Sequence, residues 1–149
     1  MRSPWCAALL PALFLLAAVG CKPDRDDVEP TIVSIVLVTQ GAGDLAGEVR
    51  VRYENLGQDP LGIERPELQL VRADRTVTSI DLGFPAGFDT SFESGASREA
   101  VFAVADSGGW SSWCGQTVDA EMQHRCVASD GTISTSMGPE MPVAIGCQR

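Results

Sequence analysis

The residues best able to do chemistry are His124 and Cys126, which lie two positions apart near the C-terminal end of the sequence. A thiol beside an imidazole can form a nucleophile and base pair, and both side chains are common metal ligands. In an extended strand, however, both side chains point to the same side as Met122, which predicts packing in a core. The spacing shows no orienting Asp or Asn and no further metal ligand nearby. We therefore expect no catalytic residue, no bound metal and no cofactor.

The segment that carries this pair is typical of a long β-hairpin. Residues alternate between apolar and polar over 117–127, and Asp130-Gly131 then supplies a two-residue turn of type I′. Pairing about this turn places the inward side chains opposite a mostly apolar set: Ile133, Thr135, Met137, Pro139, Met141, Val143 and Ile145. The turn and the hydrophobic pattern therefore agree on one register.

The same register favours a disulfide between Cys114 and Cys147. The two residues lie opposite each other on the inward face, where the Cα atoms of a non-hydrogen-bonded pair approach to about 4.5 Å. Cys126 would then be a buried free thiol. Strands this long are uncommon, and a break between Pro139 and Pro142 would instead let Cys147 reach Cys126, so both pairings stay open.

Trp110 and Trp113 lie in a Gly/Ser-rich segment directly before Cys114. Exposed on a loop, the two rings are a candidate contact for a sugar or a protein partner. The favoured interpretation is that one or both rings pack over the disulfide at the end of the fold.

The rest of the chain after residue 30 also has the alternation of β-strands, and no stretch has a helical period. In residues 48–54, for example, Val49, Val51 and Tyr53 share one face and charged residues occupy the other. Further strands are expected at 32–39, 61–63, 67–72, 76–82 and 98–105, separated by Gly, Pro, Asp and Ser. Seven or eight short strands predict an all-β fold, an immunoglobulin-like β-sandwich.

Two short motifs resemble a known family of modules. They are Val49-x-Val51-x-Tyr53-x-Asn55-x-Gly57 and Gly95-Ala-Ser97 followed by Val101-Phe102. Over roughly residues 39–105, the chain resembles the immunoglobulin-like modules of bacterial surface proteins related to the CARDB family. The resemblance implies an extracytoplasmic adhesive or spacer module rather than an enzyme. The C-terminal part differs, because a Cys-containing hairpin replaces the family's closing strand.

The N-terminus has the pattern of a targeting segment. Arg2 precedes an apolar run over 7–19, which is too short to span a bilayer as a helix. The end of this segment, Leu16-Ala-Ala-Val-Gly-Cys21, resembles the lipobox of bacterial lipoproteins. That resemblance implies that Cys21 becomes the N-terminus and carries acyl chains such as palmitate, which anchor the chain to a membrane. Ordinary cleavage after Gly20 would instead leave Cys21 as an unmodified thiol.

The expected organisation is a signal peptide over 1–20, a lipidated Cys21 with a solvated linker over 21–30, and one β-sandwich domain over 31–149. The linker is charged and flanked by prolines, so it has nothing to bury. The chain holds 20 acidic and 11 basic side chains and a formal net charge of -9, which argues against nucleic acid as a partner.

These features predict a membrane-anchored lipoprotein of the cell envelope whose extracytoplasmic domain is a non-catalytic binding or structural module. Its partner would be an envelope protein or a glycan, and Lys22 after the Cys favours the outer membrane over the inner. Two alternatives stay open. One is a secreted, non-lipidated β-sandwich with two disulfides, and the other is a small envelope enzyme or metal-binding protein that uses His124 and Cys126.

Overall fold

The computed structural model describes residues 27–148 and shows an all-β fold. The signal peptide, Cys21 and most of the expected linker lie outside the described residues. Within the described range, no helix is long and apolar enough to cross a membrane. Its elements are β1 (Val28–Gln40), β2 (Asp44–Asn55), β3 (Leu61–Val71), β4 (Val77–Asp81), β5 (Ser91–Phe92), β6 (Ser97–Asp106), the 3-10 helix η1 (Ser111–Trp113), β7 (Thr117–Ala128), β8 (Ile133–Met137) and β9 (Met141–Cys147).

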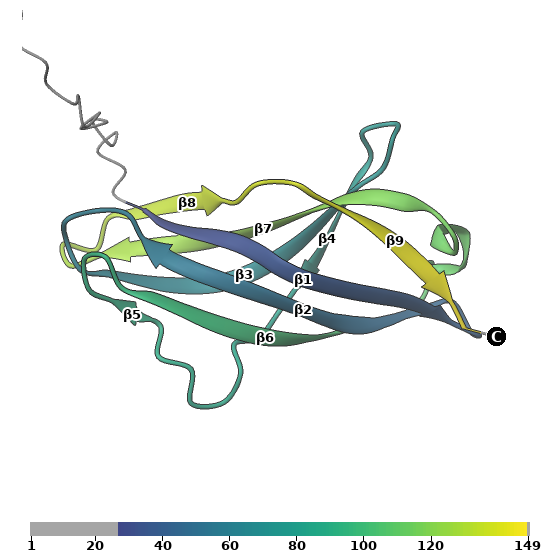
Figure 1. The fold of residues 1–149 in the computed structure, drawn as a ribbon, viewed down its shortest axis with the longest axis horizontal. Helices are drawn as coiled ribbons and strands as arrows, with labels where there is room; N and C mark the ends of the chain where they lie inside the picture. Colours follow the sequence, from purple (N-terminus) through teal and green to yellow (C-terminus); the bar gives the residue numbers. More distant parts are fainter. Residues whose placement is uncertain (1–26, 149) are drawn as a thin grey trace, which may run out of the picture.

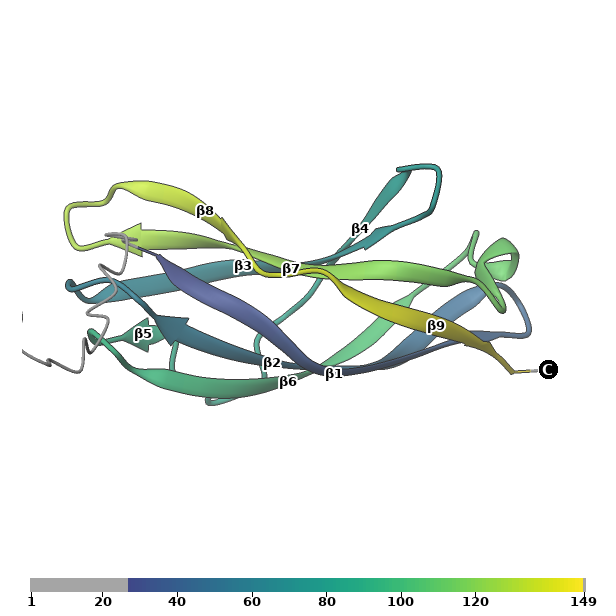
Figure 2. The same ribbon diagram turned by 45° about the horizontal axis from the view of Figure 1, so that its top comes forward.

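The strands form one curled sheet in the order β4-β3-β7-β9-β1-β2-β6, with β5 paired to β3 and β8 paired to β7. One half holds β1, β2 and β6, the other holds β4, β3, β7 and β8, and the two halves face each other (Figures 1 and 2). Strand β9 joins them, because residues 141–144 pair with β7 and residues 145–147 pair in parallel with β1.

The core lies between the two halves and is built by the alternation seen in the sequence. In β2, Val49, Val51 and Tyr53 are fully buried, as expected, while the charged residues between them face outward. Strand β3 contributes Leu68 and Leu70 from the opposite half. Because alternate residues of a strand point to opposite faces, each strand supplies one apolar row to the same core.

The domain begins earlier than the sequence suggested. Val28 and Pro30 were assigned to the linker, but both are buried residues of β1. Their side chains share the inward face with Ile32, and a bulge at Val33 then shifts the phase so that Leu37 points inward. Val28 and Pro30 therefore belong to the first strand and are buried in the fold.

Strand β3 spans two segments that the sequence presented separately. A bulge at Arg65 and Pro66 interrupts its pairing with β7 between Glu64 and Glu67. Arg65 adopts a positive φ of 51° there, and Pro66 has no N–H to donate. The bulge thus explains why the pattern looked like two short strands.

The predicted two-residue turn at Asp130-Gly131 is wrong. The loop has three residues, because the N–H of Ala128 donates to the carbonyl of Thr132 at 2.9 Å and Gly131 has a φ of 84°. The extra residue moves β8 by one position against β7. As a result Ile133 and Met137, expected inside, are 51% and 49% exposed.

The chain recovers the expected register between β8 and β9. Gly138 donates its N–H to the Met122 carbonyl, and β9 then pairs Val143 with Val118 as predicted. Val143 and Ile145 are buried, so the inward face of β9 is the one the sequence indicated. The sequence linked a break between Pro139 and Pro142 to the Cys126–Cys147 pairing, but the observed irregularity between β8 and β9 restores the register that places Cys114 opposite Cys147.

A substitution at Gly138 would disturb this break. A Cβ atom there would overlap the carbonyl oxygen of Pro30 in β1. We expect Gly138→Ala to lower the free energy of unfolding by about 1–3 kcal/mol, since the backbone of β1 must move away. Gly83→Ala is the matched control, because its Cβ meets no atom within 4 Å. Equal urea unfolding curves for the two variants would contradict this account.

Candidate functional site

His124 and Cys126 lie side by side in the core, on the inward face of β7. The Sγ atom of Cys126 is 3.4 Å from Nε2 of His124, and the two residues are 1% and 0% exposed. The ring of His124 meets the ring of Tyr53 edge-on, with centroids 5.3 Å apart. The structure therefore brings the predicted pair into contact and buries it, as the strand pattern predicted.

The first residues of β1 cover this pair. The backbone N–H of Val28 donates to Sγ of Cys126 at 3.4 Å, and the hydroxyl of Ser136 in β8 donates to Asp27 at 3.3 Å. Sequence reasoning missed this contribution, because Asp27 and Val28 lie about a hundred residues from β7 and were assigned to the linker. No local pattern could have indicated it.

Burial determines the protonation states of the pair. Loss of solvation lowers the pKa of His124 to about 4, although a hydrogen bond with the Val28 backbone opposes part of the shift. Burial also raises the pKa of the Cys126 thiol. At neutral pH both groups are therefore neutral. A buried neutral thiol is a poor nucleophile, because the thiolate is the reactive form.

Metal binding by this pair would need more ligands. Among residues 27–148, no group of three or more His, Cys, Asp or Glu side chains is placed to hold a metal ion. A zinc site needs about four ligands in tetrahedral geometry. The described contacts of His124 and Cys126 are instead those of a packed polar pair in a core.

Cys114 and Cys147 lie at disulfide distance at the opposite end of the domain, with Cα atoms 5.1 Å apart. Cys126 is a free, buried cysteine. The bond joins the residue that follows η1 to the last residue of β9. Of the two pairings that the sequence left open, the structure therefore has the one between Cys114 and Cys147.

The two tryptophans, in the segment just before Cys114, are buried and pack against each other. Trp110 and Trp113 are 3% and 6% exposed, with ring centroids 4.8 Å apart. The indole N–H of Trp110 donates to Asp106, and the guanidinium of Arg72 lies 3.9 Å from the ring centroid of Trp113. Because both indoles are covered, they offer little surface to a partner, and the packing interpretation fits their burial.

Asn55, the polar residue of the family-like motif, holds the loop at the other end of the domain. Its side-chain amide donates to the carbonyls of Asp59 and Phe92, and its Oδ1 accepts the N–H of Gly57. Asn55 is 1% exposed, so these bonds satisfy a buried amide. The motif therefore has a local structural role, which is to tie the β2–β3 loop to β5.

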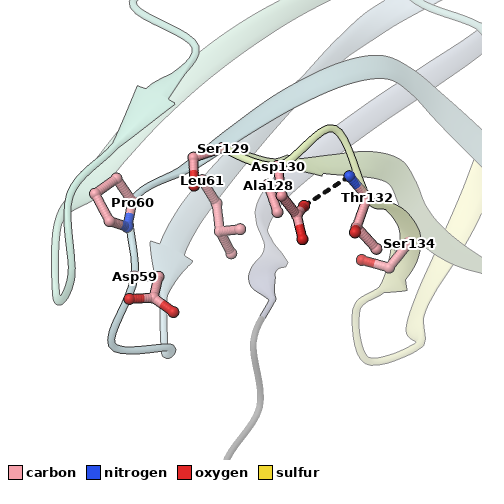
Figure 3. Close-up of a pocket in the computed structure, with 8 residues that line it drawn as sticks. All are labelled: Asp59, Pro60, Leu61, Ala128, Ser129, Asp130, Thr132 and Ser134. Atoms are coloured by element: carbon pink, nitrogen blue, oxygen red, sulfur yellow. Dashed lines mark hydrogen bonds between the residues drawn. The ribbon is translucent and has the colours of Figure 1, made fainter.

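A recess of about 340 Å³ opens at this end, between the β2–β3 loop and the β7–β8 hairpin (Figure 3). Two carboxylates, three hydroxyl groups and three apolar side chains line it, and sequence reasoning missed it because its two loops are far apart in the chain. The lining residues are Asp59, Pro60, Leu61, Ala128, Ser129, Asp130, Thr132 and Ser134. This chemistry suits a small polar or cationic group.

One of the two carboxylates in the recess is already engaged. Asp130 accepts the backbone N–H of Thr132 at 2.8 Å, drawn as a dashed line in Figure 3, and this hydrogen bond lowers its pKa. The carboxylate thus stabilises the hairpin loop that forms one wall of the recess.

The buried histidine predicts a loss of stability in mild acid. The pKa of His124 is about 4 in the folded protein and 6.5 in the unfolded chain. Between these values the unfolded state binds a proton that the folded state does not bind, so the free energy of unfolding falls as the pH drops from 6.5 towards 4. We expect a loss of about 2 kcal/mol between pH 7 and pH 5, measured by urea unfolding.

The control for this measurement is His124→Gln, which cannot titrate in this range. His124 is the only histidine of the chain, and Glu121, whose pKa is raised mainly by burial, acts in the opposite direction. The variant should therefore have nearly the same stability at both pH values. An equal loss in the variant and the parent would show that another group is responsible.

The disulfide gives a prediction on thiol counts and stability. Residues 27–148 should show one alkylatable thiol when unfolded without reductant and three after reduction. Replacing Cys114 and Cys147 together by Ala should cost about 3–4 kcal/mol, because the bond closes a loop with a sequence separation of 33. Cys126→Ser should retain the bond. Three thiols without reduction would refute the pairing.

Comparison with known proteins identifies a fold likeness but no family. No protein-family model and no curated protein matches the chain. A Bordetella pertussis protein assigned as ApaA has a TM-score of 0.55 at 13% identity, over 80% of this chain and 94% of its own. The structural genomics target SoR45 has a TM-score of 0.54 at 9% identity, over 83% of this chain and 88% of its own.

A more distant likeness has a TM-score too low to support an argument. YcdA of Bacillus subtilis, assigned as a lipoprotein, has a TM-score of 0.43 at 14% identity, over 76% of this chain and 37% of its own. The two stronger likenesses, at identities of 13% and 9%, concern the fold alone. What the comparisons establish is that the chain adopts an all-β fold also seen in solved structures.

Proposed function

We propose that this chain is a lipid-anchored protein of the bacterial cell envelope, with a domain that acts as a non-catalytic binding or structural module. The observation that carries the proposal is the short distance in sequence between Cys21, at the end of the lipobox-like motif, and the first strand at Val28. Residues 22–27 span at most about 20 Å when extended. Acyl chains on Cys21 would therefore hold the domain close to the membrane surface.

The paired cysteines support an exported location. Disulfides persist in the periplasm and at cell surfaces but are rare in the cytosol of most organisms. Here Cys114 and Cys147 lie at disulfide distance at the end of the domain opposite the start of β1 (Figure 1). This arrangement suits a domain that must stay folded outside the cytoplasm. Lys22 beside Cys21 favours sorting to the outer membrane.

We assign the domain to the immunoglobulin-like sandwiches on the basis of its strand order. One half of the sheet has β1, β2 and β6, the other has β4, β3 and β7, and β9 pairs with both β7 and β1. Sandwiches of this type place their first, second and fifth strands together and their third, sixth and seventh strands opposite. Strand β4 differs from the constant type, because it pairs with β3 instead of lying with the first, second and fifth strands. The short β5 and the division of the last strand into β8 and β9 account for the higher strand number.

The sealed His124–Cys126 pair supports a non-catalytic role over the alternative of an enzyme or metal protein. Its atoms contact Val28 and Tyr53 rather than an open cavity. The surface that suits a partner is the recess at Asp59 and Asp130, whose carboxylates and neighbouring hydroxyls can bind polar groups of an envelope protein or a glycan.

Intact-mass measurement of the mature protein tests the proposal. When the full chain is expressed in a bacterial host, we expect the mature mass to start at Cys21 and to include diacylglyceryl and acyl groups. Cys21→Ser should lose this added mass and leave the membrane fraction. Cys126→Ser is the control, and it should keep both the lipid mass and the membrane location.

Two other outcomes would overturn the proposal. A mature mass that equals the unmodified polypeptide would exclude lipidation. A mass lower than that by two further hydrogen atoms, beyond those lost in the first disulfide, would indicate a bond between Cys21 and Cys126 and support the secreted protein with two disulfides.

A further inference from the structure

We propose that the first residues of β1 form a cover that opens independently of the rest of the domain and exposes the Cys126 thiol beside His124. The cover is defined here as residues 27–32. The inference concerns these residues only and does not depend on lipidation of Cys21.

The cover is the part of the chain that separates the pair from solvent at the entry of the chain. Val28 is fully buried, and its backbone N–H donates a hydrogen bond to Sγ of Cys126. Asp27 bonds to Ser136, the residue of β8 that is paired with His124. Lifting these residues away would therefore uncover the thiol and the imidazole together.

Several polar atoms in the cover and in the core next to it lack hydrogen-bond partners. Within residues 27–148, Oδ1 of Asp27, Oη of Tyr53 and Nδ1 of His124 are buried without a hydrogen-bond partner. Each such atom costs free energy that water would restore on exposure. Opening of the cover gives Asp27 and His124 access to water, so the closed state is less favourable here than in the apolar parts of the core.

The cover has strand pairing on one side only. Residues 28–32 pair with β2, whereas β9 pairs with β1 only from Leu37 to Thr39. The bulge at Val33 separates the two parts of the strand. On the other side no backbone ladder is described between these residues and β7 or β8; the contacts there include hydrogen bonds of 3.4 and 3.3 Å and the packing of the Pro30 carbonyl against Gly138. Segments with few strong bonds open at lower free energy than central strands.

The position of the chain entry favours opening from this end. The linker joins β1 at residue 27, directly beside the pair formed by Val28 and Asn55. Fraying that begins at this end therefore breaks the Val28–Asn55 pair before the pairs further along β1.

Opening changes the chemistry of the pair. In the closed state, burial keeps Cys126 protonated and His124 neutral. In water the pKa values of both groups return towards their usual range, and the imidazole 3.4 Å away can accept the thiol proton. The exposed pair is thus suited to react with small electrophiles and oxidants, while the closed pair is not.

Native-state labelling of Cys126 with N-ethylmaleimide tests the cover. The full chain carrying Cys6→Ser and Cys21→Ser leaves Cys126 as the free thiol, because Cys114 and Cys147 are paired. We expect Val28→Ala to raise the labelling rate about tenfold, since it weakens the packing of the cover. The matched control is Val104→Ala in β6, which truncates an equally buried valine elsewhere in the core and should change the rate less than about threefold.

A second measurement keeps the test valid even if Val28→Ala unfolds. The labelling rate of the protein that carries Cys6→Ser and Cys21→Ser is followed at increasing urea below the unfolding transition. Opening of the cover alone exposes little surface, so the rate should depend only weakly on urea. A dependence as steep as that of global unfolding, or equal acceleration by Val28→Ala and Val104→Ala at equal loss of stability, would overturn the proposal.

Discussion

The hydrogen bonding of β9 is the constraint on which the rest of the domain depends. Within seven residues this strand pairs first with β7 and then with β1, so it connects the two halves of the sheet by backbone bonds as well as through the core. The connection requires a strand that can leave one partner for another. Gly138, which lies directly under the Pro30 carbonyl, and the prolines on either side of Glu140 supply that break.

Much of the fold follows from alternation in the sequence, because burial of one face fixes which side chains point inward. Tyr53 and the inward phase of β7 were predictable in this way. The β8 register was not, since Asp130-Gly131 suits both a two-residue turn and a three-residue loop with a positive φ at Gly131. Only tertiary contacts select between these two loops, and the sequence pattern of β8 favoured the two-residue turn, which is not the one observed.

The candidate site likewise has features that the sequence predicted and features that it could not predict. Strand phase predicted that His124 and Cys126 would be buried neighbours, and spacing predicted Cys114 opposite Cys147. The cover at Val28 could not be predicted, because it depends on a contact between the two ends of the domain sequence. The recess could not be predicted for the same reason. Its walls come from two loops that carry ordinary turn residues and meet only in the folded protein.

The Cys114–Cys147 link also limits how far this chain can ever be stretched. The sequence separation between the two cysteines is 33, so that segment stays closed as a loop even when every strand has separated. An unfolded but oxidised chain is therefore shorter by about 110 Å than a reduced one. A protease that cuts inside the loop would release no fragment, because the bond keeps both pieces joined.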